Sequence, residues 1–361
     1  MRNHLDNMVV ERPRVLSLYS GAGGLDLGFC QAGFEVAWAN ERNPYACQSY
    51  AHNVGDHIVE GDVLATDVPT DDFAVVIGGP PCQGWSRAGR MDPADPRSQH
   101  VHHFLDIVET VGPRAFVMEN VASLAEGPRW HDIREKLLRR VREDLSYTTR
   151  VLVLDASHFG VPQARRRMFL VGLRDGTPVS PRRRSRKPPT VREAFGRLPL
   201  YGQPGNDTQC TARVIPAKRP VMRPSAYMGA LLFNGSGRPL DLDEPARTLP
   251  ASMGGNATPI VDQVELDGRA GAWVLQYHEY LESGGAPLSE VPKQLRRITV
   301  QEAAALQSFP RSFRFFGPVG AQYRQIGNAV PPALARAVAK ALMRALGTPE
   351  VAVRNRSAAA A

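Results

Sequence analysis

The first half of the chain alternates short apolar runs with segments of helical periodicity. The strand-like runs are Val15–Tyr19, Glu35–Asn40, Phe73–Ile77, Ala115–Met118, Val151–Leu154 and Met168–Leu173. The helical patterns are Leu25–Ala32, Pro44–Asn53, Ser98–Val111 and Arg129–Asp144. Strands that are apolar on both sides and alternate with helices form a mostly parallel sheet with helices on both faces. The pattern therefore predicts an α/β fold.

This rhythm stops near Arg174, which indicates a change of domain. Residues 176–239 are rich in Pro, Gly and Arg and show no long helical period, so we expect loops and short strands. Helical signals return with a capping box at Thr299 and Glu302, and a last helix starts at Pro331-Pro332. We expect a first domain over 1–180, a smaller irregular domain over 181–317, a segment over 318–347 that returns to the first domain, and a tail over 348–361.

Composition and charge limit the class of protein. Apolar residues make up 43% of the 361 residues and charged residues 22%, which excludes intrinsic disorder of the whole chain. Lys and Arg number 44 and Asp and Glu 36, and this net charge of +8 favours a polyanionic partner such as nucleic acid. The sequence shows no membrane span or secretory signal and no Cys-x-x-Cys pair. We therefore expect a cytoplasmic protein without a metal site or disulfides.

A glycine-rich segment, Ser20–Gly28, follows the first strand and opens a helix. Glycines let the backbone turn tightly beside a ligand, and a helix N-terminus offers free N–H groups. By spacing alone this segment is a dinucleotide-binding loop, a related cofactor loop or merely a tight turn. Glu41 ends the next strand and could accept a hydrogen bond from ribose hydroxyls, and Asp62 could accept one from an adenine amino group. Together these features indicate a cofactor that contains adenosine.

Cys82 is the candidate nucleophile of the chain. It lies in Gly78-Gly79-Pro80-Pro81-Cys82-Gln83-Gly84-Trp85-Ser86, directly after a buried strand, where ligands of parallel sheets bind. An arbitrary cysteine is more often a buried structural residue, and we keep that interpretation for Cys30 and Cys47. A cysteine in a proline-rich loop fills a core poorly, so Cys82 is better explained by chemistry.

Six segments in order resemble the DNA cytosine-5 methyltransferases, and in particular the compact bacterial enzymes of restriction-modification systems. The match covers residues 14–173 and 296–346, and the Pro-Pro-Cys segment is its most specific part. The segments are Ser20–Leu25, Pro80–Ser86, Met118–Val121, Gln163–Arg167, Arg296–Pro310 and Tyr323–Pro332. The resemblance implies a Rossmann-like methyltransferase domain that uses S-adenosylmethionine and no metal, and a target-recognition domain over about 181–295.

By this resemblance Cys82 adds to carbon 6 of cytosine and thereby activates carbon 5. Glu119 would stabilise ring nitrogen 3, although a carboxylate that merely ends a strand is the alternative. Arg165 and Arg167 alternate with Arg166 along an extended segment, so both can reach one pocket, where they would hold the base and the active-site loop. The residues that would bind the cofactor are Tyr19, Gly21, Gly23, Leu25, Glu41, Asp62, Val63, Pro81, Asn328 and Val330.

Three positions depart from the family pattern. Tyr19 stands where Phe is usual, Arg42 where an aromatic residue often stacks on adenine, and Ser308 where Gly is frequent. The change at Tyr19 keeps the ring, and the guanidinium of Arg42 could still stack on the adenine. We expect the change at Ser308 to be neutral.

The resemblance implies double-stranded DNA as the partner, with the target cytosine flipped out of the duplex. The basic loop after Cys82 could close over the base or be a generic surface loop, and the run Arg182–Lys187 would contact phosphate or form a solvated linker. Arginines of the middle region could read guanine. The expected DNA-binding residues are Ser86, Arg87, Arg97, Arg223, Arg238, Arg247 and Asn256.

The length leaves room for a catalytic core and one recognition region. We expect a monomer in the bacterial cytoplasm, associated with the nucleoid through DNA, and a cognate restriction endonuclease that acts separately. Three alternatives stay open. The first is a tRNA cytosine-5 methyltransferase, although the Cys-Phe-Thr element of that branch is not found. The second is a nicotinamide dehydrogenase, which would leave Cys82 and Glu119 unexplained. The third is a non-catalytic DNA-binding regulator on the same fold.

Overall fold

A computed structural model describes residues 12–81, 99–184 and 187–347. Its main feature is a seven-stranded sheet in the order β3-β2-β1-β4-β5-β8-β6. The strands are β1 (Arg14–Leu18), β2 (Glu35–Glu41), β3 (Ile58–Glu60), β4 (Val75–Gly78), β5 (Ala115–Val121), β6 (Thr148–Asp155) and β8 (Arg166–Leu173). Each strand-like run of the sequence overlaps one of these strands.

The sheet is parallel except at β8, which is antiparallel to both β5 and β6. Only residues 156–165 connect β6 to β8, too short a link for a helical crossover between parallel strands. β8 therefore runs back alongside β6. The mostly parallel α/β fold predicted from the sequence is confirmed.

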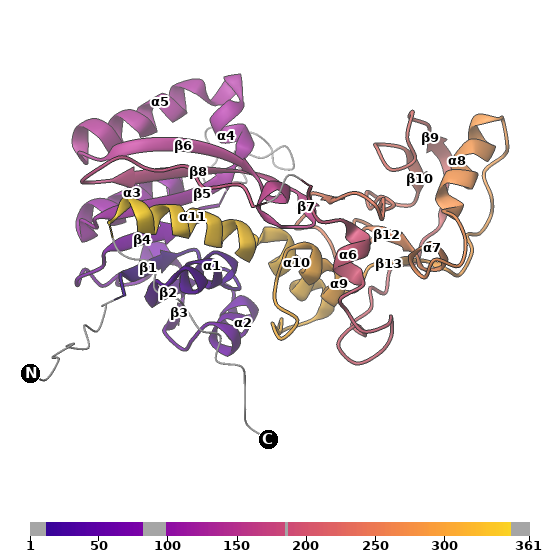
Figure 1. Ribbon diagram of the computed structural model, residues 1–361, viewed down its shortest axis with the longest axis horizontal. Helices are drawn as coiled ribbons and strands as arrows, with labels where there is room; N and C mark the ends of the chain where they lie inside the picture. The colour runs from indigo at the N-terminus through magenta and orange to yellow at the C-terminus, as the bar shows by residue number, and fades with distance from the viewer. Residues whose placement is uncertain (1–11, 82–98, 185–186, 348–361) are drawn as a thin grey trace, which may run out of the picture.

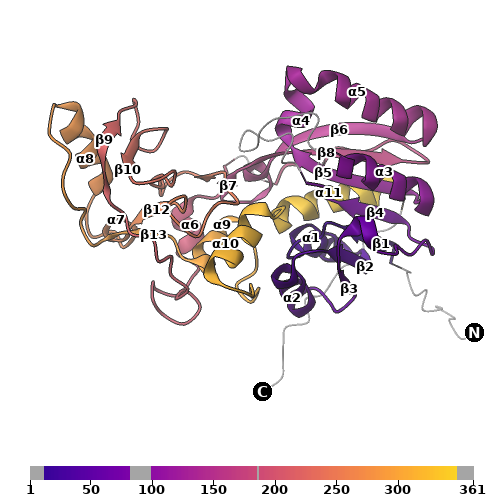
Figure 2. The same ribbon diagram turned by 180° about the vertical axis from the view of Figure 1, so that it is seen from behind.

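Helices cover both faces of the sheet, as Figures 1 and 2 show from opposite sides. Neighbouring residues of β1 face different cores, because Val15 packs in one hydrophobic cluster and Leu16 in the other. No described helix is long and apolar enough to cross a membrane. The first face carries α1 (Gly24–Ala32), α2 (Pro44–Asn53) and α11 (Pro332–Ala345), and the second α3 (Gln99–Val111), α4 (Ala122–Glu126) and α5 (His131–Arg139).

The first and last helices of the described chain pack so closely that there is no room for a side chain between their backbones. A Cβ atom on Gly28 of α1 would lie 2.4 Å from the Cβ of Ala335 and 2.6 Å from the backbone nitrogen of Arg336. A Cβ on Gly24 would lie 2.4 Å from the carbonyl oxygen of Val330. Glycine at both positions lets α1 contact α11 and the segment that precedes it.

A smaller lobe projects from this sheet domain (Figure 1). Two antiparallel strand pairs and two short helices form it, and its hydrophobic cluster includes Phe233, Ile260 and Tyr277. This agrees with the expectation of loops and short strands. Its elements are β9 (Pro216–Val221), β10 (Leu231–Phe233), β12 (Ile260–Asp262), β13 (Leu295–Arg297), α7 (Gln263–Leu266) and α8 (Trp273–Glu282).

A junction between the two lobes has a hydrophobic cluster of its own. In this cluster Phe309 and Tyr323 pack with Val261 and with Ala22 of the glycine-rich segment. The capping box predicted at the start of α9 is present, since Thr299 and Glu302 exchange both of its hydrogen bonds. The elements of the junction are β7 (Gln163–Ala164), β11 (Ala246–Arg247), α6 (Val191–Phe195), α9 (Val300–Leu306) and α10 (Val319–Asn328).

Candidate active site

The site is a cleft of about 1740 Å³ at the edge of the sheet where the parallel strands β1, β2, β4 and β5 end. One wall is the sheet domain, from the glycine-rich segment to Glu119. The other wall comes from the junction and includes Arg247, Leu249 and Asn328. The cleft therefore brings together segments that lie more than 200 residues apart in the sequence.

The glycine-rich segment turns through left-handed backbone conformations, with φ of 57° at Gly21 and 90° at Gly23. The backbone nitrogen of Gly21 donates a hydrogen bond to Glu41 Oε2 at 3.0 Å, and Gly21 lines the cleft. Gly23 faces the protein, where a Cβ atom would lie 2.7 Å from Val54 Cγ2. Gly21 can therefore contact a ligand, whereas Gly23 shapes the turn.

Two carboxylates and an apolar side chain stand along the same wall. Glu41 closes β2, and its Oε1 accepts a hydrogen bond from the Asn43 backbone nitrogen at 2.8 Å. Asp62 Oδ1 accepts from the Leu64 backbone nitrogen at 3.1 Å, and Val63 is buried beside it. Since a carboxylate has about four acceptor positions, Glu41 and Asp62 both keep capacity for hydroxyl or amino groups of a ligand.

Tyr19 directly follows β1 and has a left-handed conformation, with φ of 55°. Its hydroxyl lies 3.1 Å from His100 Nδ1 and donates to the His100 carbonyl oxygen at 3.3 Å. The hydroxyl that distinguishes Tyr19 from the usual Phe therefore contacts α3. Sequence reasoning missed His100, which lines the cleft, because no motif marks it.

Glu119 and two arginines form the charged centre of the cleft. Arg167 Nε lies 3.1 Å from Glu119 Oε1, and the two side chains are only 15% and 13% exposed. Burial raises the pKa of Glu119 above its usual value, and the charges of Arg167 and Arg165 oppose this rise. Glu119 therefore holds a proton to a higher pH than an ordinary glutamate, as a carboxyl group that donates a proton requires.

The segment that leads to Cys82 enters the cleft beside Glu119. A Cβ atom on Gly79 would lie 3.2 Å from Glu119 Oε2. Asn120 Nδ2 donates to the Pro80 carbonyl oxygen at 3.3 Å, and Pro81 lines the cleft. Cys82 itself lies outside the described residues.

The other cysteines expected to be structural fit that role. Cys47 is buried, and burial raises the pKa of its thiol to about 12. Burial likewise raises the pKa of the Cys30 thiol to about 11. A thiol of such high pKa is not ionised at neutral pH and is therefore a poor nucleophile.

Arg165 is almost fully buried, with 1% of its surface exposed. Its guanidinium donates to the Leu249 carbonyl oxygen at 3.1 Å and to the Gly327 carbonyl oxygen at 2.8 Å. Arg165, which lies between β7 and β8, therefore ties this part of the chain to two segments of the junction. Arg166, expected to face the other way, also lines the cleft and pairs there with Glu126.

The structure brings most of the expected cofactor residues to one cleft. Gly23 is the exception, for the reason given above. Those that line the cleft are Tyr19, Gly21, Leu25, Glu41, Asp62, Val63, Pro81, Asn328 and Val330.

The expected DNA-binding residues divide into three groups. Arg247 is exposed and lines the cleft. Arg223, Arg238 and Asn256 lie in the small lobe away from it, and the Arg238 guanidinium donates to the carbonyl oxygens of its own loop at Gly235 and Gly237. Ser86, Arg87 and Arg97 lie outside the described residues. Sequence reasoning missed two further cations of the cleft, Arg129 and Arg324. Arg129 belongs to no recognised motif, and in the segment Tyr323–Pro332, which contains Arg324, only Asn328 and Val330 were expected at the site.

The fold and the cleft together define a class of protein, the Rossmann-like α/β enzymes that bind a cofactor at the carboxyl edge of a mostly parallel sheet. A family model described as C-5 cytosine-specific DNA methylase matches residues 13–344. The chain belongs to this family and is a DNA cytosine-5 methyltransferase.

Known relatives resemble the chain over nearly its whole length. The Type II methyltransferase M1.HphI of Haemophilus parahaemolyticus is 34% identical over 91% of this chain and 86% of its own length. M.XorII of Xanthomonas oryzae pv. oryzae is 32% identical over 93% and 85%. The solved structure of the S. pombe Dnmt2 methyltransferase covers 93% of this chain and 99% of its own, with a TM-score of 0.64 at 20% identity. The last comparison supports the fold alone.

Proposed function

We propose that this enzyme transfers a methyl group from S-adenosylmethionine to carbon 5 of a cytosine that is flipped out of a specific short duplex sequence. The arrangement of Glu119, Arg167 and Pro81 at one end of the cleft, opposite Glu41 and Asp62, carries the proposal. One end holds a carboxyl group and a cation beside the segment that leads to Cys82. The other end offers acceptors for the hydroxyl and amino groups of adenosine.

The side chains that line the cleft suit S-adenosylmethionine. Glu41 would accept from the ribose hydroxyls and Asp62, beside Val63, from the adenine amino group. Tyr19, Gly21 and Leu25 would face the methionine part, and Asn328 and Val330 would close the site from the junction. The bound cofactor supplies the methyl group as its sulfur–methyl bond breaks, leaving S-adenosylhomocysteine as the product, and all other steps fall to residues of this chain.

The proposed reaction begins with the Cys82 thiolate. The sulfur forms a bond to carbon 6 of cytosine, the ring electrons shift toward nitrogen 3, and Glu119 gives its proton to nitrogen 3. Carbon 5, now part of an enamine, takes the methyl group. Loss of the carbon 5 proton to solvent then returns electrons to the ring, the carbon–sulfur bond breaks, and the nitrogen 3 proton returns to Glu119. Arg167, paired with Glu119, and Arg165 would orient the base and this carboxyl group.

We also propose that the enzyme is the monomeric modification enzyme of a restriction-modification system, since the relatives above are named Type II methyltransferases. A cognate endonuclease would act separately. Binding to its DNA substrate would place the methyltransferase on the bacterial nucleoid. For the domains we retain 1–180 and 318–347 as catalytic and 181–317 as target-recognising. The separate cluster around Phe233 and Tyr277 supports an independent recognition lobe.

Bisulfite sequencing of a plasmid from cells that express the protein tests this proposal. We expect protected cytosines within one short sequence context, and none in cells that express Cys82→Ser. A duplex that carries 5-fluorocytosine at the protected position should trap the protein covalently, because the fluorine cannot leave as the proton does. An unmodified plasmid, or methyl transfer from labelled cofactor to tRNA instead of duplex DNA, would contradict the proposal.

A further inference from the structure

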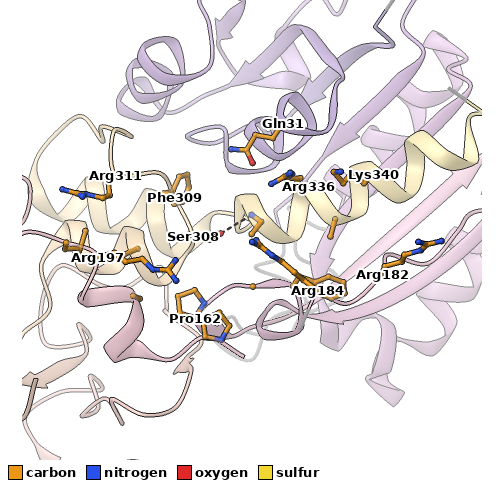
Figure 3. A pocket seen from close by; sticks show the side chains of 18 of the residues that line it. Gln31, Pro162, Arg182, Arg184, Arg197, Ser308, Phe309, Arg311, Arg336 and Lys340 are labelled. Carbon is orange, nitrogen blue, oxygen red and sulfur yellow. Dashed lines mark hydrogen bonds between the residues drawn. The ribbon is translucent and has the colours of Figure 1, made fainter. Parts of the chain in front are cut away.

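A second pocket, of about 680 Å³, lies on the side of the junction away from the catalytic cleft. The helix α11 forms one side, and the segment that carries Arg182 and Arg184 forms the opposite side (Figure 3). Gln31 at the end of α1, Arg197 after α6 and residues around the end of α9 complete it. The pocket thus lies where the catalytic domain meets the recognition part of the chain.

The two pockets have no lining residue in common, although neighbouring residues of the same segments line one or the other. Pro162 lines the second pocket, whereas Ala164, two residues later, lines the catalytic cleft. In the same way Val330 lines the cleft and Ala333 lines the second pocket. The hydroxyl of Ser308 accepts a hydrogen bond from the Ala333 backbone nitrogen at 3.1 Å, which holds together the two segments on this side of the second pocket. A duplex in the catalytic cleft would therefore leave the second pocket open.

The lining of the second pocket is strongly cationic. Seven arginine and lysine side chains line it, and none of its described lining residues is acidic. The catalytic cleft differs, because Glu41, Asp62 and Glu119 lie among its cations. A site with seven cations and no carboxylate attracts multiply charged anions.

Five of the seven cations have no acidic partner within the described chain. They make no ion pair with any residue of 12–81, 99–184 or 187–347, and all five are exposed. Like charges held close together repel, so an anion that enters relieves this repulsion. These five residues are Arg182, Arg184, Arg197, Arg311 and Arg336.

We propose that this pocket binds a small molecule that carries a chain of phosphate groups. The volume falls in the range of small-molecule sites, roughly 300–1000 Å³, and is too small for a nucleic acid duplex. Six of the seven cations are arginines, whose planar guanidinium groups bind phosphate oxygens in pairs. The apolar floor, which includes Pro162 and Phe309, would exclude water beneath the ligand. Because the pocket adjoins α11 of the sheet domain and α6 of the junction, a bound ligand would contact both of these parts.

Calorimetric titration of the full-length protein with inorganic tripolyphosphate, at fixed ionic strength, tests the proposal. We expect Arg336→Glu, and independently Arg311→Glu, to weaken binding by more than about tenfold, since each replaces an attraction with a repulsion. The control is Arg139→Glu, an exposed arginine on α5 that lines neither pocket. It should change the affinity by less than about twofold, because exposed charges at a distance are screened by salt.

Two further arms separate this pocket from the DNA site. Arg247→Glu, which changes the catalytic cleft, should leave tripolyphosphate binding intact, and a saturating short duplex should not displace the anion. ATP in place of tripolyphosphate tests whether the ligand includes a nucleoside. Absence of binding, equal losses in the Arg139 and Arg336 variants, or displacement by the duplex would overturn the proposal. Binding of a single-stranded oligonucleotide that depends on Arg336, without any binding of tripolyphosphate, would also overturn the proposal.

Discussion

At the residue scale the surroundings of Glu119 determine when this carboxyl group holds or releases a proton. Its carboxyl group is held by Arg167 and lies against the segment that leads to Cys82. Burial raises its pKa and the neighbouring arginines lower it, so the balance between them sets the pH at which the group gives up its proton.

Replacement of this carboxyl group should remove most of the turnover. We expect Glu119→Gln to lower kcat by about 10²- to 10⁴-fold, because an amide has no acidic proton to give to the base. Single-turnover transfer of labelled methyl groups measures this effect, and calorimetry should show unchanged cofactor binding. Glu126→Gln is the matched control, since Glu126 also lines the cleft but pairs with Arg166. Equal losses in both variants would contradict the role of Glu119.

Asp26 is a second buried carboxyl group, in the first turn of α1. It is fully buried and accepts a hydrogen bond from the Tyr50 hydroxyl at 2.9 Å. Burial raises its pKa from 3.8 to about 6. The folded protein therefore binds this proton more tightly than the unfolded chain does. The resulting stability is fully present below about pH 4 and is lost as the pH rises through about 6.

Asp26→Asn should remove that loss. The amide oxygen can still accept from Tyr50, and no buried charge forms at high pH. We expect the variant to be more stable than the parent at pH 8 by about 1–3 kcal/mol, with a smaller difference at pH 4. Urea unfolding at both pH values measures this. A variant that is less stable at pH 8 would show that the ionised carboxylate has a stabilising role.

Ser308 shows what a residue pattern alone could not predict. The change from the frequent Gly was expected to be neutral, but its backbone is left-handed, with φ of 62°. Glycine adopts this conformation at little cost, whereas serine does so under strain. The Ser308 hydroxyl offsets part of that strain through its bond to the start of α11. The preference for Gly therefore has a physical cause that only the backbone angle reveals.

At the scale of elements, the strands and helices of the first half were predictable because each has one period and a clear boundary. The helix predicted over Pro44–Asn53 agrees with α2 at both ends, and its start is marked by the cap Asn43 and by Pro44. The reversal of β8 was not visible in the apolar pattern, because a buried strand is apolar in either direction. The elements of the small lobe were the least predictable, since its strands are short and its core is assembled from distant segments.

The contact between α1 and α11 gives a prediction at this scale. Gly28→Ala should destabilise the protein by about 1–3 kcal/mol, because the new methyl group meets Ala335 and the backbone of Arg336. Gly320→Ala in α10 is the control. A Cβ at Gly320 meets open space, so helix propensity should stabilise that variant by about 0.5–1 kcal/mol. Thermal unfolding compares the two, and similar losses of stability in both would refute the packing argument.

At the scale of the whole molecule, the cleft joins segments that only the fold brings together. The motifs led to the residues on the sheet that we propose to bind the cofactor, and the resemblance predicted Asn328 and Val330 for the same site; all but Gly23 line one cleft. The link that Arg165 makes to Leu249 and Gly327 could not be predicted, since it depends on how the junction packs. The arginine content of the middle region could not show that Arg247 alone of the three candidate arginines there reaches the cleft.

DNA binding should reflect this arrangement. We expect Arg247→Ala to weaken duplex binding and to reduce the slope of log affinity against log salt by about 1, as for loss of one phosphate contact. Arg139→Ala, at an exposed residue at the end of α5 that does not line the cleft, should leave the slope unchanged. Fluorescence anisotropy at several salt concentrations measures both. An unchanged slope in the Arg247 variant would indicate that the residue reads a base or makes no contact with DNA.

The packing of α11 against α1 also has a consequence for biosynthesis. Leu334, Val338 and Leu342 complete the same core that Val15 and Phe29 begin. A ribosome releases these late residues only after the whole recognition lobe has emerged. The sheet domain is therefore the first part of the described chain to be synthesised and the last to complete its core. Until α11 is synthesised, the apolar face that α11 covers stays exposed and must be kept from aggregation.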